Sequence, residues 1–356
     1  MSNSIRIRTL TDGGQQPPEI ARLVAEFLGG AQHSLDLAQY DFNLGPETRE
    51  VVAGAIRDAA ARGVAVRILY NVDHPNPIPV PPPPEPDVAL ISALGVPSKA
   101  IAGVPDLMHH KFVVRDGESV WTGSMNWTDD SWSRQENVVV TVDSAELAKP
   151  FTLDFEELWR DGDVERSGFA AEPRPVEVDG LRVRAWFTPG FAEALTHRIA
   201  KKVGRAERVR ICSPVITSAP VLATLAQRIA DGKGDIAGCV DATQMEDVLR
   251  QWKAQGTVAW KIPLLQQVLA GSFSGKNSTP WAPGSLHDFM HAKVVVADNT
   301  VFVGSFNLSH SGEQNAENVV ELEDPELAKQ LGAFVDEVRG RYPRVTPTRS
   351  SMGAST

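Results

Sequence analysis

The sequence is poor in features that mark specialised protein classes. Its 356 residues include only two cysteines, no apolar run long enough to span a membrane and no excess of basic side chains. The net charge of −10 argues against a broad surface that coats nucleic acid, although a local positive pocket stays open. Cys212 and Cys239 lie in short apolar segments, so we expect two reduced core cysteines and no disulfide. No Cys/His cluster has zinc-ligand spacing, and we expect neither metal nor cofactor.

The composition that remains is that of an ordinary globular protein. Hydrophobic residues make up 42% and charged residues 22%, and the length suits about two domains that each bury a core. The N-terminal residues contain no apolar stretch that resembles a signal peptide. We therefore expect a cytoplasmic protein, or a secreted one if the sequence is a trimmed mature form.

Apolar periodicity alternates between strand-like and helix-like segments. We expect strands at 5–10, 33–40, 64–70, 107–114, 119–122, 138–142, 208–216 and 236–241. We expect helices at 18–29, 48–62, 145–160, 195–202, 221–230, 245–254 and 326–339. Strand–helix–strand units with short connections indicate an α/β fold in which helices cover a sheet with parallel strands.

Four segments interrupt this rhythm. Residues 71–87 are dense in proline and predict a surface loop, with a partner-binding motif as the alternative. Residues 161–180 predict a linker. Residues 260–283 place apolar side chains among Gly, Ser and Pro, which predicts a loop or lid, or else packing against the first domain. The chain is polar from residue 343, and we expect a disordered tail that includes 346–356.

One pattern occurs twice, at a nearly constant offset of 181 to 182 residues. The first copy consists of His109, Lys111, Asp116, Gly123, Ser124, Asn126, Glu136 and Asn137. The second copy consists of His291, Lys293, Asp298, Gly304, Ser305, Asn307, Glu317 and Asn318. Self-similarity at one long period indicates a duplicated unit.

The residue types in the pattern suit phosphoryl transfer. Side chains two residues apart on a strand share a face, so each His emerges beside its Lys. If the halves pack about a pseudo-two-fold axis, two imidazoles can serve as nucleophile and acid. The two ammonium groups can then neutralise phosphate oxygens. The Ser and Asn side chains at 124, 126, 305 and 307 add neutral donors for phosphate.

Some members of the pattern have a structural alternative. Asp116 and Asp298 stand at expected hairpin turns, where Asp is favoured by local geometry, so a catalytic and a structural role are both open. His110 has Ala292 as its counterpart in the second copy, and we leave it out of the expected site.

The two copies resemble the paired HxKxxxxD and GSxN signatures of the phospholipase D superfamily, over about 330 residues. The resemblance implies an α/β fold with two tandem homologous domains, each a mixed sheet flanked by helices, at 1–165 and 181–345. It also implies catalysis through a phosphohistidine, with His109 as nucleophile and His291 as general acid and then base, although the order stays open. Glu136 and Glu317 match family acids that orient the imidazoles.

The superfamily contains phospholipases, lipid synthases and nucleases, so the fold leaves the substrate open. We expect a metal-independent phosphodiesterase that acts on a phospholipid, with transient contact to a membrane surface. The first alternative is a nuclease, and the second is an inactive binding module. The first copy especially resembles single-motif endonucleases and mitochondrial cardiolipin hydrolases, which act as dimers. This chain would build its site as a monomer without an obligatory protein partner.

Overall fold

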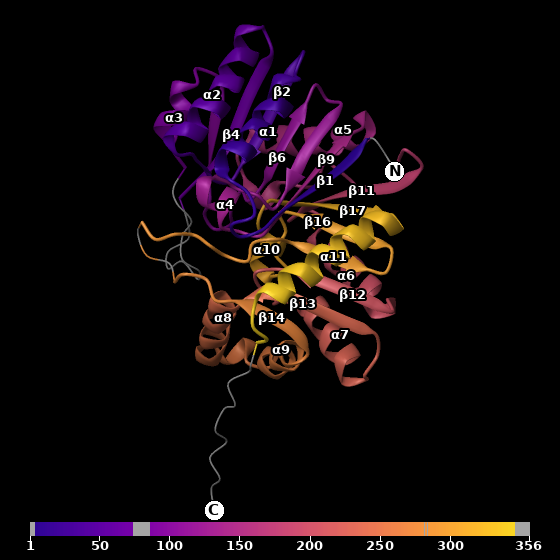
Figure 1. Cartoon of the computed structure of the whole chain (residues 1–356). Coiled ribbons are helices and arrows are strands. Elements are labelled where there is room, and N and C mark those ends of the chain that lie inside the picture. Colours follow the sequence, from indigo (N-terminus) through magenta and orange to yellow (C-terminus); the bar gives the residue numbers. More distant parts are fainter. Residues whose placement is uncertain (1–3, 74–85, 281, 283, 346–356) are drawn as a thin grey trace, which may run out of the picture.

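The computed structural model describes residues 4–73, 86–280, 282 and 284–345. Two mixed β-sheets face each other across the middle of the molecule, and helices cover their outer faces (Figure 1). The first sheet is built from residues between 5 and 143 and the second from residues between 176 and 323. The predicted α/β fold with duplicated domains is confirmed.

The first sheet has seven strands. In sheet order they are β1 (Ile5–Leu10), β9 (Asn137–Asp143), β7 (Ser119–Gly123), β6 (Lys111–Arg115), β2 (Ser34–Gln39), β4 (Ala65–Val72) and β5 (Ser98–Ala102). Strands β2, β4 and β5 are parallel to one another, and the other pairs are antiparallel. The parallel part corresponds to the strand–helix–strand units of the sequence.

The second sheet repeats this order and adds one edge strand. Its eight strands are β10 (Val176–Val178), β11 (Leu181–Thr188), β17 (Glu317–Glu323), β16 (Thr300–Gly304), β15 (Val294–Ala297), β12 (Arg208–Cys212), β13 (Asp235–Asp241) and β14 (Ser272–Lys276). Strands β12, β13 and β14 are parallel to one another, like β2, β4 and β5. The two motif strands, β6 and β15, therefore hold the same position in their sheets.

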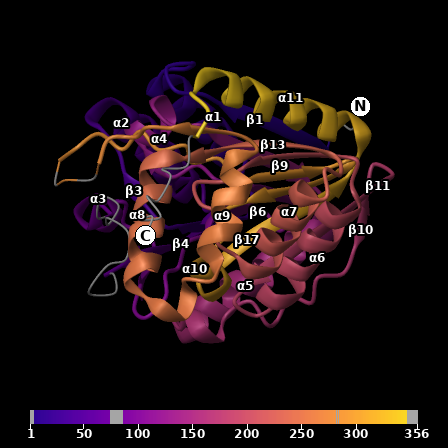
Figure 2. The ribbon, with the colours of Figure 1, turned by 90° about the horizontal axis from the view of Figure 1, so that it is seen from below.

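Amphipathic helices cover the two outer faces. Those over the first sheet are α1 (Pro17–Gly29), α2 (Pro46–Ala61), α3 (Val88–Ala93) and α4 (Asp129–Ser133). Those over the second sheet are α6 (Ala192–Arg205), α7 (Ala219–Ala230), α8 (Ala242–Ala254) and α9 (Lys261–Ala270), seen from below in Figure 2. In α1, for example, Ile20, Val24, Phe27 and Leu28 recur at helical spacing and are buried.

A single apolar core lies between the sheets and belongs to both halves. Helices α5 (Ala145–Asp161) and α11 (Pro325–Arg341) contribute side chains to it. Phe151 of α5 lies 5.0 Å from the ring of Phe187 on β11 and 5.2 Å from that of Phe112 on β6. The shorter elements are β3 (Phe42–Asn43), β8 (Trp127–Thr128), α10 (His310–Gln314) and the 3-10 turns η1 (Val164–Arg166) and η2 (Gly256–Val258).

The prediction of a loop or lid at 260–283 is wrong for most of that segment. Residues 261–270 form α9 and residues 272–276 form β14. Leu265 and Phe273 are fully buried in the core of the second half, so the segment does not pack against the first domain instead. Pro263 misled the interpretation, because proline is compatible with the first turn of a helix. Trp260 stays 56% exposed.

Other differences concern short elements and the chain ends. The sequence interpretation did not include β11, α3 or β5, and the expected linker at 161–180 contains η1 and β10. The expectation of disorder from residue 343 is wrong at its start, where Arg344 forms an antiparallel bridge with Ser274 of β14. The expected loop residues 74–85 and tail residues 346–356 lie outside the described residues.

Two expectations from composition can be compared with the described residues. Cys212 and Cys239 are both buried and carry free thiols, as neighbours on β12 and β13. Across the described ranges, no helix combines the length and the apolar character that crossing a membrane requires.

Candidate active site

The two copies of the repeated pattern meet at the seam between the sheets. Met108, which precedes His109, forms a parallel bridge with Ala316, and Met290, which precedes His291, forms one with Glu136. Each histidine segment thus lies against the Glu-Asn segment of the other half. The convergence that the sequence predicted is therefore seen in the structure.

His109 lies between two groups of the second half. Its Nδ1 is 2.8 Å from Oε2 of Glu317, and its imidazole is hydrogen-bonded to the backbone of Ser305. The Glu317 side chain is fully buried, and that of His109 is 7% exposed. This contact matches the orienting role that the resemblance implies for Glu317.

His291 has the converse surroundings in the first half, but with a neutral partner. Its Nδ1 is 3.1 Å from the amide oxygen of Asn137, and its imidazole is hydrogen-bonded to the backbone of Ser124. The same amide oxygen accepts a hydrogen bond from the Ser124 hydroxyl at 2.7 Å. Asn137 is the partner of His291, and it was missed as a site residue although its Glu-Asn pair is repeated.

The motif lysines fix the backbone of their histidines. Lys111 Nζ donates to the carbonyl oxygen of His109 at 2.8 Å, and Lys293 Nζ donates to that of His291 at 2.7 Å. Burial lowers the pKa of Lys111 to about 7, while the negative charges of Glu317 and Asp41 act against this. Burial and the charge of Lys111 also lower the pKa of Lys293.

The same burial acts on the acid–base groups. It lowers the pKa of both His109 and His291 well below the usual range, and the charges of Lys111 and Lys293 lower it further. It raises the pKa of Glu317 to about 7, against the attraction of Lys111. A lowered pKa favours the neutral imidazole, which is the form that a nucleophile requires.

The two motif aspartates lie at the hairpin turns and bind backbone. Asp116 has a φ of 57°, and its carboxylate accepts hydrogen bonds from the N–H groups of residues 32 to 34 at 2.6–3.2 Å. Asp298 has a φ of 49° and accepts from the N–H groups of residues 207 and 208. Five strand residues from Lys111 to Asp116 span about 17 Å. The position of Asp116 and Asp298 at the hairpin turns therefore favours a structural role over a catalytic one.

The Gly-Ser-x-Asn turns bring backbone close to the histidines. A Cβ on Gly123 or Gly304 would lie 2.1 Å from a backbone oxygen of the neighbouring strand, so only glycine fits there. The hydroxyl oxygens of Ser124 and Ser305 accept hydrogen bonds from the N–H groups of residues 138 and 318 at 3.0 Å, which ties them into the turns.

Asn126 and Asn307 differ from these serines. Each has a buried side-chain oxygen for which the described residues supply no hydrogen-bond partner. Buried amide groups normally find partners, so both side chains stay candidate ligands for a substrate.

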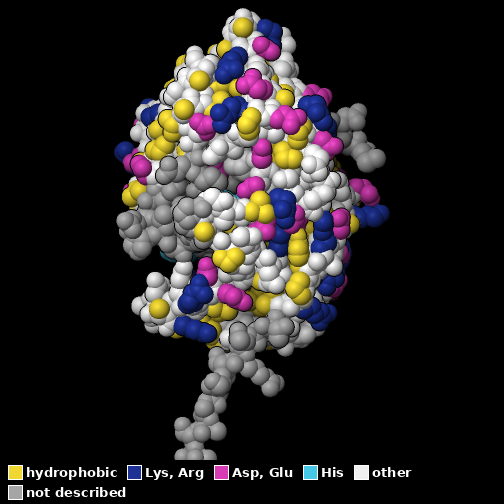
Figure 3. Space-filling model, turned by 60° about the vertical axis from the view of Figure 1, so that its left-hand side comes forward, with side chains coloured by type: hydrophobic (Ala, Val, Ile, Leu, Met, Phe, Trp, Pro, Cys, Tyr) yellow, Lys and Arg dark blue, Asp and Glu magenta, His cyan; other side chains and the backbone are white. Residues whose placement is uncertain are grey.

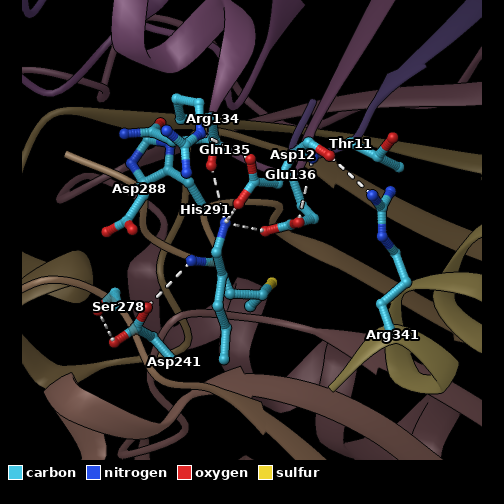
Figure 4. A network of polar contacts seen from close by, with 12 residues as sticks. Thr11, Asp12, Arg134, Gln135, Glu136, Asp241, Ser278, Asp288, His291 and Arg341 are labelled. Atoms are coloured by element: carbon cyan, nitrogen blue, oxygen red, sulfur yellow. Dashed lines mark hydrogen bonds and ion pairs between the residues drawn. The ribbon is translucent and has the colours of Figure 1, made fainter. Parts of the chain in front are cut away.

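Glu136 is the counterpart of Glu317 in the repeated pattern, but strand register places Asn137 at the position of Glu317 and Glu136 at that of Ala316. The Glu136 carboxylate accepts hydrogen bonds from Lys276 Nζ at 3.1 Å, from the backbone N–H of Asp12 at 3.3 Å and from the hydroxyl of Tyr342. These contacts belong to the network in Figure 4. Within the described residues, His291 is not among the hydrogen-bond partners of Glu136, which departs from what the resemblance implies.

Two residues beside His109 and Lys111 were not foreseen. The rings of Tyr40 and His109 meet edge to face, with their centres 4.4 Å apart. Lys111 Nζ lies 4.7 Å from the centre of the Tyr40 ring. Asp41 is 1% exposed, and burial raises the pKa of its carboxyl group well above the usual range. Neither residue recurs in the second half, so the repeat contained no signal for them.

His110 was set aside on sequence grounds and lies in the core behind the site. Its Nε2 is 2.9 Å from Asp154 Oδ2, and its Nδ1 is 3.2 Å from the amide nitrogen of Asn318. Among the residues that the structure describes, no group of three or more His, Cys, Asp and Glu side chains is arranged to hold a metal ion. The cations of the site are Lys111 and Lys293.

Comparisons with known proteins agree with this arrangement. The family described as "Cardiolipin synthase, PLD-like domain" matches residues 24–159 and 199–338. The mitochondrial cardiolipin hydrolase of Xenopus laevis is 32% identical over 153 residues, which cover 43% of this chain and 66% of that protein. The human mitochondrial cardiolipin hydrolase is 29% identical over 175 residues, which cover 47% of this chain and 64% of that protein. The chain thus spans about two thirds of the length of these relatives.

A solved structure extends the likeness to the whole fold. Phosphatidylserine synthase of Haemophilus influenzae Rd KW20 superposes with a TM-score of 0.67 at 14% identity, covering 96% of this chain and 87% of that chain. At this identity the similarity concerns the fold alone. The family match covers both halves and includes both copies of the repeated pattern, so this chain belongs to the phospholipase D-like family.

Proposed function

We propose that the protein is a phosphodiesterase that cleaves a phospholipid through a covalent phosphohistidine on His109. The observation that carries the proposal is the buried contact of 2.8 Å between Nδ1 of His109 and Glu317, across the seam from His291. A carboxylate at Nδ1 keeps the proton on that nitrogen, which leaves the lone pair of Nε2 for attack. It also stabilises the positive charge that the ring acquires when Nε2 bonds to phosphorus.

The first step forms one bond and breaks one. Nε2 of His109 attacks phosphorus, and the bond from phosphorus to the leaving alcohol oxygen breaks. His291, which has taken up a proton, donates it to that oxygen. The binding of an anionic phosphodiester between Lys111 and Lys293 favours protonated groups beside it, so substrate binding helps to charge His291.

The second step restores the enzyme. Neutral His291 removes a proton from a water molecule, and the oxygen of that water attacks phosphorus. The bond between phosphorus and Nε2 of His109 then breaks, which releases a phosphomonoester. Lys111 and Lys293 bind the phosphate oxygens in both steps, and the side-chain amide nitrogens of Asn126 and Asn307 donate neutral hydrogen bonds to them.

We propose an anionic glycerophospholipid such as cardiolipin as the substrate. The named relatives are cardiolipin hydrolases, and the family description refers to cardiolipin synthase. In the described part of the face drawn in Figure 3, basic and acidic side chains are interspersed. Nucleic-acid binding generally uses a continuous basic track, so this face favours lipid over nucleic acid. Since one chain supplies both histidines, a monomer suffices.

The first test compares the wild type with His109→Ala and His291→Ala, with EDTA present. Phosphatidylcholine vesicles that contain cardiolipin are the lipid substrate. Bis(p-nitrophenyl) phosphate and single-stranded DNA are offered in parallel. We expect cardiolipin to yield phosphatidic acid and phosphatidylglycerol, with turnover reduced about 10²–10⁴-fold or more in both variants.

Bis(p-nitrophenyl) phosphate separates the roles of the two histidines, because nitrophenolate leaves without protonation. His291→Ala should release one equivalent of nitrophenolate and retain a phosphoryl adduct on His109 that mass spectrometry detects. His109→Ala should form no adduct. Cleavage of DNA alone would replace the lipid proposal with a nuclease, and an adduct on His291 would reverse the assigned order.

A further inference from the structure

A second pair of side chains crosses the seam on the core side of the site. Nδ1 of His110 lies 3.2 Å from the amide nitrogen of Asn318, directly next to the pair formed by His109 and Glu317. Neighbouring residues of an extended chain point to opposite faces, and the ring of His110 meets that of Phe112 in the shared core. The two segments are therefore joined by side chains on both faces.

Two further polar residues extend this contact into a cluster. The amide oxygen of Asn318 accepts a hydrogen bond of 2.5 Å from the hydroxyl of Thr122 on β7. Nε2 of His110 lies 2.9 Å from Oδ2 of Asp154 on α5, at ion-pair distance but outside the direction of a hydrogen bond. We call Thr122, Asn318, His110 and Asp154 the polar cluster. Each of these residues is at most 1% exposed, so the polar cluster depends on its own contacts.

The His291 side of the seam has apolar residues at the four equivalent positions. They are Ala292 for His110, Val303 for Thr122, Val138 for Asn318 and Phe334 for Asp154, and all four are buried in the shared core. The first two follow from the repeated pattern. Strand register gives the third, because the motif glycine lies opposite Val139 in one sheet and opposite Val319 in the other. The fourth stands ten residues after the N-cap residue of α11, as Asp154 does after that of α5.

Stability alone does not account for the polar cluster. The described residues supply no hydrogen-bond partner for either carboxylate oxygen of Asp154, and a buried carboxylate without donors is costly. Apolar side chains of similar volume often stabilise a core at least as well as a buried polar pair does. The His291 side of the seam shows that this fold accommodates such side chains. The polar cluster therefore requires a reason beyond packing.

Asn318 connects the polar cluster to the residue that orients the nucleophile. Its backbone N–H donates to the hydroxyl of Ser305 at 3.0 Å, and its carbonyl oxygen accepts from the N–H of Ser305 at 3.0 Å, so its backbone belongs to the second half. Its side-chain amide bonds to Thr122 and His110 of the first half. Hydrogen bonds are directional, whereas apolar contacts allow sliding. Asn318 thus fixes the register of the seam one residue away from Glu317.

We propose that the polar cluster is a positioning device that holds the carboxylate of Glu317 against Nδ1 of His109. The inference rests on the proposed function, in which His109 is the nucleophile and must keep its proton on Nδ1. His291 only transfers protons in that mechanism, so it needs no equivalent device, and its side of the seam is apolar. The residues of the polar cluster act through Glu317 and are not catalytic residues.

The test replaces the polar cluster with apolar side chains of similar volume. This apolar variant combines His110→Leu, Asp154→Val, Thr122→Val and Asn318→Val. The first readout is the rate of adduct formation from bis(p-nitrophenyl) phosphate in a His291→Ala background, which isolates the attack by His109. We expect the rate per folded molecule to fall about 10–10²-fold. Urea unfolding should show a midpoint equal to or higher than that of the parent protein.

The second readout needs no turnover. Nitrogen and proton NMR signals of the histidine rings, assigned with His109→Gln, report which ring nitrogen of His109 carries the proton. They are recorded at pH 8, where Glu317 is ionised because its pKa is about 7. We expect a fixed Nδ1–H tautomer in the wild type and a mixture of both tautomers in the apolar variant. A role in packing alone would not change the tautomer.

Further variants separate positioning from general damage to the core. Thr196→Val removes a buried hydroxyl that bonds to a backbone carbonyl of its own helix, α6, and should leave both readouts unchanged. His110→Gln keeps an acceptor for Asn318 and a donor beside Asp154, so it should retain the parent rate within about threefold. If the apolar variant does not fold, Thr122→Val alone removes one bond of the Asn318 amide and should shift both readouts in the same direction.

Three results would overturn the proposal. If a folded apolar variant, or folded Thr122→Val, keeps the parent rate and the Nδ1–H tautomer, the polar cluster only packs the core. A slower reaction with an unchanged tautomer would exclude Glu317 as the route. Equal losses in Thr196→Val would mean that any buried substitution disturbs the site. A protein that forms no adduct and cleaves no phosphodiester would refute the proposed function, and the tautomer of His109 would still decide the role of the polar cluster.

Discussion

Lys111 places a charged group where water is largely excluded. It is 2% exposed, and its ammonium group lies between the ring of Tyr40 and the carbonyl oxygen of His109. Its pKa of about 7 means that the folded protein holds this proton less tightly than the unfolded chain does. The folded protein therefore tolerates an unfavourable charge at low pH in order to bind an anion.

Lys111→Met should consequently stabilise the fold under acidic conditions. At pH 6, both folded and unfolded Lys111 are charged, so the cost of burial is fully present in the wild type. Glu317 is protonated at that pH, because its pKa is about 7, and is not left as an unpaired anion. After allowance for the lost hydrogen bond to His109, we expect a gain of about 2–4 kcal/mol in the free energy of unfolding.

The gain should shrink as the pH rises from 7 towards 10.5, because the unfolded chain then binds more protons than the folded protein and wild-type stability increases. Urea unfolding at pH 6, 8 and 9.5 measures this trend. The exposed Lys253→Met serves as control and should stay within about 0.5 kcal/mol of the wild type. A gain that did not depend on pH would show that Lys111 is not the titrating group.

At the scale of single elements, the hairpin between β6 and β7 depends on Asp116. The left-handed backbone conformation there is unfavourable for most side chains but accessible to Asp and Asn. The carboxylate also binds three consecutive backbone N–H groups that join the hairpin to the start of β2. A role in the hairpin and a role in the chemistry therefore predict different consequences of substitution.

Asp116→Ala should lower stability and spare catalysis. We expect a loss of about 1–3 kcal/mol, from the strained backbone and the lost hydrogen bonds, and kcat/KM per folded molecule within about twofold of the wild type. Asp116→Asn keeps an acceptor and tolerates the conformation, so it should lose less. Thermal unfolding and initial rates on bis(p-nitrophenyl) phosphate give both numbers. A large fall in kcat with unchanged stability would restore the catalytic role.

Elements were predictable from the sequence where residues were repeated or strictly periodic. The two histidine motifs and β6, β7, β15 and β16 follow from the duplication, because each feature occurs twice at one offset. Helix α9 was missed because Pro263 and Gly271 at its ends gave the impression of a loop. Tyr40 and Lys276 were missed because each occurs in one half alone. The counterpart of Tyr40 in the second half is Pro214, and the counterpart of Lys276 in the first half is Ile101, which only strand register reveals.

At the scale of the whole molecule, the two halves share the core between the sheets. Phe187 of the second half is fully buried and packs against Phe151 of the first. Neither half can keep its inner face covered alone, because that face is apolar across its central strands. The histidines at the seam therefore depend on the integrity of both halves.

Phe187→Ala should destabilise both halves together. Removal of this side chain should cost about 3–5 kcal/mol and preserve a single unfolding transition. Hydrogen exchange should then quicken by a similar factor in β6 and in β15, which mass spectrometry can resolve. The exposed Phe169→Ala should change little, since that ring is 57% exposed. Two separate transitions would mean that the halves are independent folding units.

The fusion of both halves in one chain has a consequence for what substitution can achieve. In a symmetric dimer of identical subunits, every replacement appears on both sides of the axis, so both histidines must keep equivalent surroundings. A dimer could carry a lysine at the position of Lys276 twice or not at all. A single chain can change one side alone, as Ile101 and Lys276 illustrate. Covalent linkage thus allows two originally equivalent histidines to specialise.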